Sequence, residues 1–467
     1  MDLLRPWREY PSSRSMVERT PRERDRVVDL VRALSLVVVV FGHSFMASVT
    51  FGPTVLSNTL AQTPWLQLAT WILQVMPLFF AAGAWANALS YRKAAGYPSW
   101  LNDRVRRLVR PVIIYTLFWI VISPLLLWWD AEIALPLLKI STQLLWFLGA
   151  YLLVTALTPV LVRLAVRPVV ATLGWLALGA SVDGARLAGA PSALGLANFV
   201  VVWALAGQCG LWAFSPSQRP SRSQALGIAV SAVAVNVCLV ALGPWPRSLV
   251  GLPGEEISNM APPSVVLALH CITLAALVVL GYDLLARLAK RDDVWRPTCV
   301  VNAAAMTVYL WHLAGMILAI SAIALLGRDL VGYSTPGWTL PRFTFWLLFA
   351  AFTVGLVFLM RPFEHIPLPW WDAKPRAKAI DSWSYRARST VSSIGVVLVA
   401  VGLLALSVTG LVGFPFGVAS QYAGFAFTPG LTIIVAFVGV VLIRLGAVGP
   451  EPRASTRDEA PAPAAMP

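Results

Sequence analysis

Charged residues are scarce in this chain. Only 12% of its 467 residues are Asp, Glu, Lys or Arg, whereas a soluble domain carries about 25%. Hydrophobic residues make up 58% of the chain. So little charge cannot keep this much apolar surface inside a water-soluble globule, and the composition therefore indicates a protein whose solvent is lipid.

Motifs of several common site classes are also missing. The sequence has no P-loop, no GxGxxG after a strand, no GxSxG elbow and no zinc-type spacing. Its four cysteines lie in or at the ends of apolar stretches without CxxC spacing, so we expect buried packing residues rather than disulfides or metal ligands. We predict no metal and no permanently bound cofactor.

Long apolar stretches recur from residue 29 to residue 443, and each can cross a hydrocarbon core of ~30 Å with ~20 residues. Backbone groups in lipid must bond to one another, which stretches of this length do as helices. We therefore predict an all-α, polytopic transmembrane bundle of about twelve helices, the first of them retained rather than cleaved as a signal peptide. The predicted spans are 29–49, 65–90, 111–129, 144–162, 168–182, 197–214, 224–243, 263–283, 299–322, 343–360, 391–413 and 427–443.

The basic residues predict the orientation of these spans. Of the 36 Lys and Arg residues, 30 lie in the tails and loops on one side of the predicted membrane and five lie on the other. The positive-inside rule makes the first side cytoplasmic, which gives a multi-pass protein of a bacterial-type cell membrane with both termini inside. The net charge of +14 then reflects topology and membrane-lipid contact, and no nucleic-acid partner is expected.

The remaining basic residue, Arg32, lies inside the first predicted span. A charge near the bilayer centre costs ~2.5–3.5 kcal/mol, so such residues are usually functional, although Arg32 can also snorkel to lipid phosphates. No Asp or Glu lies mid-span, which argues against an ion-coupled carrier. His43, His270 and His312 do lie within spans, so we expect intramembrane chemistry to use imidazole. For His270, which belongs to no motif, we expect a structural role.

Arg32 and His43 are eleven residues apart, which in a helix is about three turns plus ~20° and ~16 Å of rise. Both side chains therefore project from one face, with Arg32 near the cytoplasmic surface and His43 toward mid-membrane. This arrangement suits a site that holds an anion at its mouth and transfers a proton deeper in, because neutral histidine can act as a general base. A hydrogen bond from His43 to a neighbouring helix is the alternative.

Five segments, in this order, resemble the acyltransferase-3 family of integral-membrane O-acyltransferases over about residues 26–361. They match its Arg–His first helix, its Pro-x-Phe-Phe second helix, its basic entry to the third, its Trp-Phe-Leu segment and a late Tyr-x-x-His. The segments are Arg26-Val-Val-Asp29-Leu-Val-Arg32…Gly42-His43-Ser44, Pro77-Leu-Phe79-Phe80-Ala-Ala-Gly83-Ala84, Arg104-Val-Arg106-Arg107-Leu-Val-Arg110-Pro111, Leu145-Trp146-Phe147-Leu148 and Tyr309-Leu-Trp-His312. The chain departs from the pattern at Gly83, where a serine is usual, and at Ala84, where a glycine is usual.

The resemblance implies a ten-helix core that moves an acyl group from a cytoplasmic thioester, commonly acyl-CoA, to a hydroxyl of an extracytoplasmic glycan or lipid. It makes His43 the catalytic residue. For the CoA phosphates we predict contacts with Arg32 and the basic segment, because arginine forks suit phosphate. Ordinary positive-inside charge is the alternative for that segment. Its predicted phosphate-binding residues are Arg104, Arg106, Arg107 and Arg110, with Arg104 and Arg107 spaced to share one ligand.

The late motif contributes His312, predicted to orient the acceptor or His43. It also contributes Tyr309, one turn earlier on the same face, which we predict to contact the substrate. The two histidines lie at similar depths in their helices, ~21 Å for His43 and ~20 Å for His312, so they can meet. For the acceptor we further predict contacts with Trp146, from the family's Trp-Phe-Leu segment, and with two residues of the outer loop 244–263, Glu255 and Asn259, whose alternative is an ordinary solvated turn.

The predicted organisation is a basic tail (1–28), the acyltransferase domain (29–361), a basic aromatic linker (362–390), two added transmembrane helices (391–448) and a disordered tail (449–467). A flippase or exporter of a lipid-linked or polyanionic substrate also fits twelve spans, as does a catalytically inactive scaffold. The oligomeric state, the acyl chain length and the acceptor are not determined by the sequence.

Overall fold

The computed structural model describes residues 13–18, 20–21, 24–50, 55–252, 255–331, 333, 335–366, 368–373, 383–417, 419–422 and 425–448. Within these residues, twelve helical stretches are long and apolar enough to cross a membrane. Each overlaps one of the twelve predicted spans, so the predicted all-α, polytopic fold is confirmed. Parts of the predicted basic tail and of the linker, and the whole tail 449–467, lie outside the described residues.

The chain forms two compact units, one from residues 1–83 and 169–366 and the other from 84–168 and 367–467. In the first unit the elements are α2 (Ser13–Glu18), α3 (Arg26–Met46), β1 (Ala47–Thr50), β2 (Val55–Asn58), α4 (Thr59–Gln62), η1 (Pro64–Ala69), α5 (Thr70–Leu73), the start of α6 (Met76–Arg92), α11 (Pro168–Leu187), η2 (Ser192–Leu196), α12 (Ala197–Ala213), α13 (Arg222–Leu242), α14 (Val265–Lys290), α15 (Asp292–Ala303), α16 (Ala305–Leu325), α17 (Thr339–Met360) and η3 (Arg361–His365).

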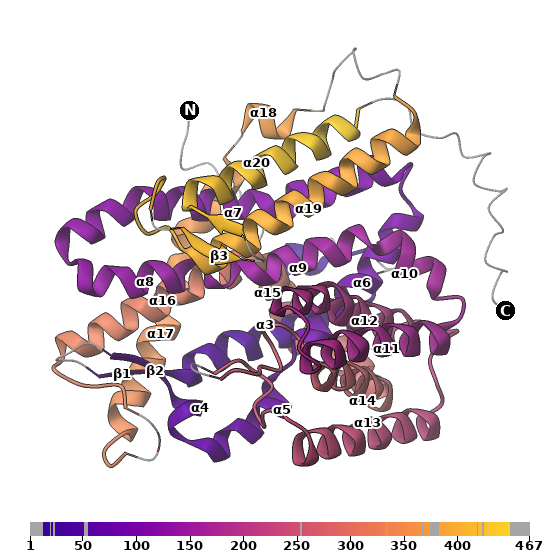
Figure 1. Ribbon diagram of the computed structural model, residues 1–467, viewed down its shortest axis with the longest axis horizontal. Helices are drawn as coiled ribbons and strands as arrows, with labels where there is room; N and C mark the ends of the chain where they lie inside the picture. The colour runs from indigo at the N-terminus through magenta and orange to yellow at the C-terminus, as the bar shows by residue number, and fades with distance from the viewer. Residues whose placement is uncertain are drawn as a thin grey trace. The chain divides into compact units, whose positions relative to one another are not determined.

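The second unit contains the rest of α6 together with α7 (Tyr97–Trp129), α8 (Ala131–Gln143), α9 (Leu145–Ala156), α10 (Thr158–Leu164), α18 (Pro369–Asp372), α19 (Tyr385–Thr409), β3 (Ser420–Tyr422), β4 (Phe425–Phe427) and α20 (Pro429–Gly446). The two helices that extend beyond the predicted core, α19 and α20, pack along each other and against α7, and α19 also packs against α8 and α9 (Figure 1).

Close backbone contacts at small residues hold both bundles together. In the first unit, a Cβ added at Gly210 of α12 would lie 2.1 Å from the Ala81 carbonyl oxygen of α6. In the second, a Cβ at Gly149 of α9 would lie 3.0 Å from the Ala400 carbonyl oxygen of α19. Small residues let membrane helices approach where lipid provides no hydrophobic drive. The extension is therefore an integral part of the second bundle.

Helix α3 begins at a well-formed N-cap. The Asp25 carboxylate accepts hydrogen bonds from the backbone N–H groups of Val27 and Val28 at 3.1 and 3.2 Å, which satisfies two of the four donors that a helix start leaves unpaired. Asp29 in the first turn pairs with Arg24. The helix ends where Ala47 becomes extended and begins β1.

Two hairpins were not expected from the sequence. Strands β1 and β2 pair antiparallel with Ala47 opposite Asn58, and β3 and β4 pair in the same way with Ser420 opposite Phe427. Each strand is only three or four residues long, too short for an alternating apolar pattern to stand out from a loop. The first hairpin matters for the site because it directly follows α3.

Candidate active site

Helices α3 and α16 bring two predicted site residues, His43 and His312, into contact. The Nδ1 atom of His43 lies 3.1 Å from Nε2 of His312, and the ring centroids are 5.2 Å apart with 25° between the ring planes. His312 is fully buried, whereas His43 is partly buried. The two rings are 269 positions apart in the chain, so this contact depends on how the helices pack.

The hydrogen bonds of His312 determine which nitrogen carries the proton in each ring. Its Nδ1 faces two backbone carbonyls, those of Tyr309 at 2.8 Å and Val308 at 3.2 Å. Carbonyl oxygens only accept, so Nδ1 of His312 is the protonated nitrogen and Nε2 keeps its lone pair. His43 must then donate from Nδ1, and its own lone pair lies on Nε2.

This chain of bonds prepares His43 to accept a proton. Among the described residues His43 makes no hydrogen bond through Nε2, while its Nδ1–H is held by His312. A carboxylate more commonly orients a basic histidine in this way. Here a second imidazole, anchored by a backbone carbonyl, occupies that position. Tyr309 contributes that carbonyl, and its ring centroid lies 6.1 Å from that of His312.

The chain just beyond His43 is enclosed by a loop and by a buried arginine. The ring of Phe45 stacks on Tyr333 at 4.6 Å, and the Tyr333 hydroxyl donates to the Phe45 carbonyl at 3.0 Å. Burial raises the pKa of Tyr333 to about 12, so this hydroxyl keeps its proton. Arg342, which is fully buried, donates to the carbonyls of Ala47 at 2.6 Å and Val331 at 2.7 Å.

Arg342 was not singled out from the sequence, which placed it at the end of an outer loop. It is instead buried in α17, and both of its carbonyl partners come from the chain around the β1 hairpin and the segment after α16. Pairing with backbone carbonyls makes a buried guanidinium tolerable. In the sequence, the one sign of this role is that Arg342 is a basic residue next to an aromatic and apolar stretch.

Arg32 lies on α3, eleven residues before His43. Its guanidinium carbon lies 5.6 Å from the centroid of the Phe79 ring on α6, and its Nε is buried without a hydrogen-bond partner in the described part of the chain. The nearest carboxylate along α3, Asp29, is bonded to Arg24 instead. Arg32 therefore keeps its charge unpaired by protein within the described residues, as expected of a cation that receives an anion.

The four arginines at the start of α7 all lie in the second unit, and they do not form one cluster. Arg104 donates to Ser90 of α6. Arg107 is exposed, and its Nε bonds the Asp103 carbonyl of its own helix at 3.1 Å. The two residues predicted to share a ligand therefore bond different protein groups.

Arg106 and Arg110 instead converge on an anion that the chain itself supplies. Asp372 of α18 lies 2.5 Å from Nη1 of Arg110 and 3.6 Å from Nη2 of Arg106. The pKa of Asp372 is lowered: desolvation acts to raise it, and the Leu368 N–H and the Arg110 guanidinium outweigh that effect. This carboxylate lay in the predicted linker, and no sequence signal connected it with α7.

The other three predicted substrate contacts, besides Tyr309, lie in different surroundings. Trp146 is partly buried at the start of α9 in the second unit. Glu255 is partly buried in the loop before α14, where burial raises its pKa. Asn259 is fully buried. Its amide donates to the Pro246 and Ser248 carbonyls and accepts from Ser264, so Asn259 holds its own loop together.

Two further titratable groups of the first unit, His270 and Glu364, are buried. His270 is buried and bonds the Gln74 carbonyl at 3.1 Å. Glu364, missed because it fell in the predicted linker, is buried and accepts from Thr307 of α16 at 2.9 Å. In the described residues, no three His, Cys, Asp or Glu side chains are grouped so that they could hold a metal ion.

Comparisons with known proteins agree with the sequence motifs. The family model described as an acyltransferase domain matches residues 25–361, a stretch that begins at the α3 N-cap and includes both histidines. Comparison with curated proteins and with solved structures found no match. This match covers well over half of the chain, and it shows that this multi-pass membrane protein belongs to the acyltransferase-3 family.

Proposed function

We propose that the protein is an O-acyltransferase that moves an acyl group from cytoplasmic acyl-CoA to a hydroxyl of a glycan, glycolipid or other cell-envelope acceptor. The observation that carries the proposal is the His43–His312 pair, in which the tautomers leave a lone pair on His43 Nε2. The orientation that it requires, with the start of α3 at the cytoplasmic side, comes from the distribution of Lys and Arg.

The reaction uses one base and no intermediate on the protein. His43 Nε2 takes the proton of the acceptor hydroxyl as its oxygen attacks the thioester carbonyl carbon. The carbon–sulfur bond then breaks, and the proton passes from His43 to the departing thiolate. The products are an ester and free CoA. During the step His43 is cationic, and neutral His312 stabilises it by accepting the Nδ1–H bond.

Arg32 is proposed to hold a donor phosphate. Arg32 lies ~16 Å from His43 along the axis of α3. This distance leaves room for the flexible arm that joins the phosphate of CoA to its thioester. Arginine suits this role because its guanidinium stays charged and can donate two parallel bonds to phosphate. Arg104, Arg106, Arg107 and Arg110 remain proposed donor contacts from the sequence, and a phosphate that uses Arg106 or Arg110 must replace Asp372.

The proposal is tested by incubating purified protein in proteoliposomes with radiolabelled acetyl-CoA and a cell-envelope lipid and glycan fraction. Transfer of label to a hydroxyl of the acceptor, with release of CoA thiol, supports an acyltransferase. Movement of unmodified acceptor across the vesicle membrane, without acyl transfer, would support the rival flippase or exporter. His43→Ala is the matched variant, because it removes the base and leaves Arg32 in place.

A further inference from the structure

An apolar groove lies in the first unit between α3, α6 and α14, and neither His43 nor His312 lines it. Its volume is about 270 Å³. Its walls are aliphatic, contributed mainly by Val31, Val38, Leu78, Leu274 and Leu285. A cavity of about 150 Å³ holds a benzene molecule, so this groove has room for a segment of roughly ten chain carbons.

The groove opens on the surface of the unit. Leu34 of α3 and Leu277 and Leu284 of α14 line it, and each is about half exposed. In a membrane-spanning bundle, exposed leucines on transmembrane helices face lipid. The groove is therefore accessible from the side, where membrane lipid chains are present at high concentration.

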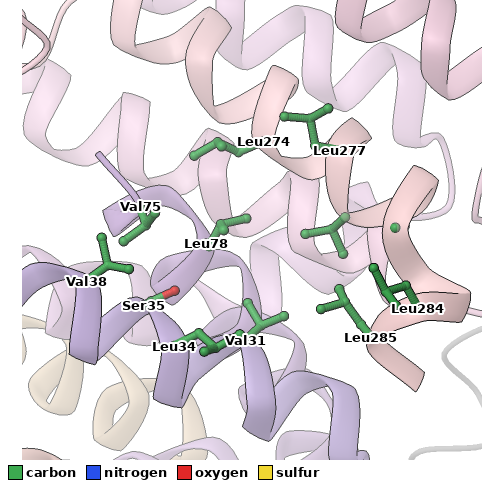
Figure 2. Close-up of a pocket in the computed structure, with 12 residues that line it drawn as sticks. Val31, Leu34, Ser35, Val38, Val75, Leu78, Leu274, Leu277, Leu284 and Leu285 are labelled. Carbon is green, nitrogen blue, oxygen red and sulfur yellow. The ribbon is translucent and has the colours of Figure 1, made fainter. Parts of the chain in front are cut away.

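One polar group interrupts the aliphatic wall. Ser35 is 2% exposed, and its hydroxyl has no hydrogen-bond partner among the described residues. Figure 2 shows the hydroxyl oxygen of Ser35 directed into the space between the helices. A buried hydroxyl without a partner costs free energy, so its position indicates a ligand that carries a hydrogen-bond acceptor.

Two basic residues follow the end of the groove at the last turn of α14, and the nearby carboxylate of Asp283 is paired with Arg222. Leu284 and Leu285 line that end, and Arg287 and Lys290 follow in the last turn of the same helix. Both side chains are exposed. Cations at this position, just beyond an apolar chain site, suit the phosphate of a lipid headgroup.

We propose that this groove is a binding site for a membrane glycerophospholipid, with one acyl chain between α3 and α14 and an ester carbonyl accepting the Ser35 hydroxyl. The headgroup phosphate lies toward Arg287 and Lys290. The site is separate from the acyl-transfer chemistry proposed above and does not depend on it. It gives the α3 helix, which carries His43, a lipid neighbour on the face formed by Val31, Leu34, Ser35 and Val38.

Gly281 offers a substitution that begins in open space and extends the side chain into the groove. A Cβ added at Gly281, which lines the groove, meets nothing within 4 Å, so Gly281→Leu places a side chain in the space that the lipid chain would occupy. Gly227 of α13 is the matched control, because its Cβ also meets nothing within 4 Å and it does not line the groove.

The test uses a phosphatidylglycerol probe with a photoactivatable acyl chain, in proteoliposomes of the intact protein. Labelled peptides should map to Val31–Val38 and Leu274–Leu285. Labelling there should be lost in Gly281→Leu and retained in Gly227→Leu. Equal labelling of these peptides in the two variants would overturn the proposal.

Two comparisons test the Ser35 hydrogen bond and the identity of the bound chain without relying on Gly281. An ether-linked probe lacks the ester carbonyl, so the wild type should prefer the ester probe by about fivefold, the worth of one hydrogen bond, and Ser35→Ala should lose that preference. An equal preference in wild type and Ser35→Ala contradicts the hydrogen bond. Displacement of the probe by long-chain acyl-CoA would assign the groove to the donor chain and overturn the lipid proposal.

Discussion

The most specific prediction concerns His312, proposed as a positioning residue for His43. Replacing it with glutamine, asparagine or alanine separates its two hydrogen bonds. A glutamine amide oxygen can reach the place of Nε2 and accept from His43 Nδ1–H. An asparagine amide can reach the place of Nδ1 and bond the Tyr309 carbonyl, but it offers no acceptor to His43. Alanine offers neither.

The expected size of the effect follows from the 3.1 Å contact between the rings. Leaving a buried donor without its acceptor costs about 1–3 kcal/mol, which corresponds to about 5- to 150-fold in rate. His312→Ala and His312→Asn should both lose acyl transfer to this extent. His312→Gln should recover most of it, because the acceptor for His43 is restored.

The assay is the single-turnover rate of acyl transfer in proteoliposomes, normalised to folded protein and measured at saturating donor. His270→Ala is the matched control, since it also removes a buried imidazole that bonds one backbone carbonyl, and its rate per folded molecule should stay at the wild-type value. If asparagine supports transfer as well as glutamine does, His312 acts only through the Tyr309 carbonyl and the tautomer argument is wrong.

Three further predictions concern the donor site and the packing. Arg32→Gln should raise the KM for acyl-CoA by about 10- to 150-fold, the range for a charged hydrogen bond. Arg222→Gln, at an exposed ion pair, should leave this KM unchanged. Equal effects of the two substitutions would exclude a donor contact at Arg32. Asp372→Asn frees Arg106 and Arg110 and should lower the KM for acyl-CoA by up to about fivefold, since an exposed ion pair is worth up to ~1 kcal/mol. An unchanged KM would show that neither arginine contacts the donor. Gly210→Ala should destabilise the protein by about 1–3 kcal/mol through overpacking against Ala81. Its midpoint of thermal unfolding should be lower than that of Gly227→Ala. Equal midpoints would contradict the close contact.

The features that could be predicted from the sequence depend on local patterns. The spans follow from hydropathy alone, and the helical period places Arg32 and His43 on one face of α3 without any knowledge of its neighbours. The order of the motifs indicated the acyltransferase-3 family, which the family match confirms. These signals lie within single helices or within the chain order.

The features that were missed depend on tertiary contacts. The bond between His43 and His312 joins two helices. The depth of each residue along its helix, estimated from the sequence, showed only that the two rings can meet. Asp372 lies 262 positions from Arg110. Which α7 arginines pair with a carboxylate and which stay exposed is therefore set by tertiary packing. Arg342 can be buried because Ala47 of β1 and Val331 after α16 supply carbonyls to its guanidinium. The roles of the predicted site residues stay predictions until variants are measured.

The central claim is that His43 is the base for acyl transfer, and one measurement tests it directly. His43→Ala protein, reconstituted beside the wild type, is assayed for binding of labelled acyl-CoA and for its transfer to the acceptor fraction. We expect an unchanged Kd for acyl-CoA and a transfer rate about 10²- to 10⁴-fold lower. Transfer at the wild-type rate by the folded variant would contradict it.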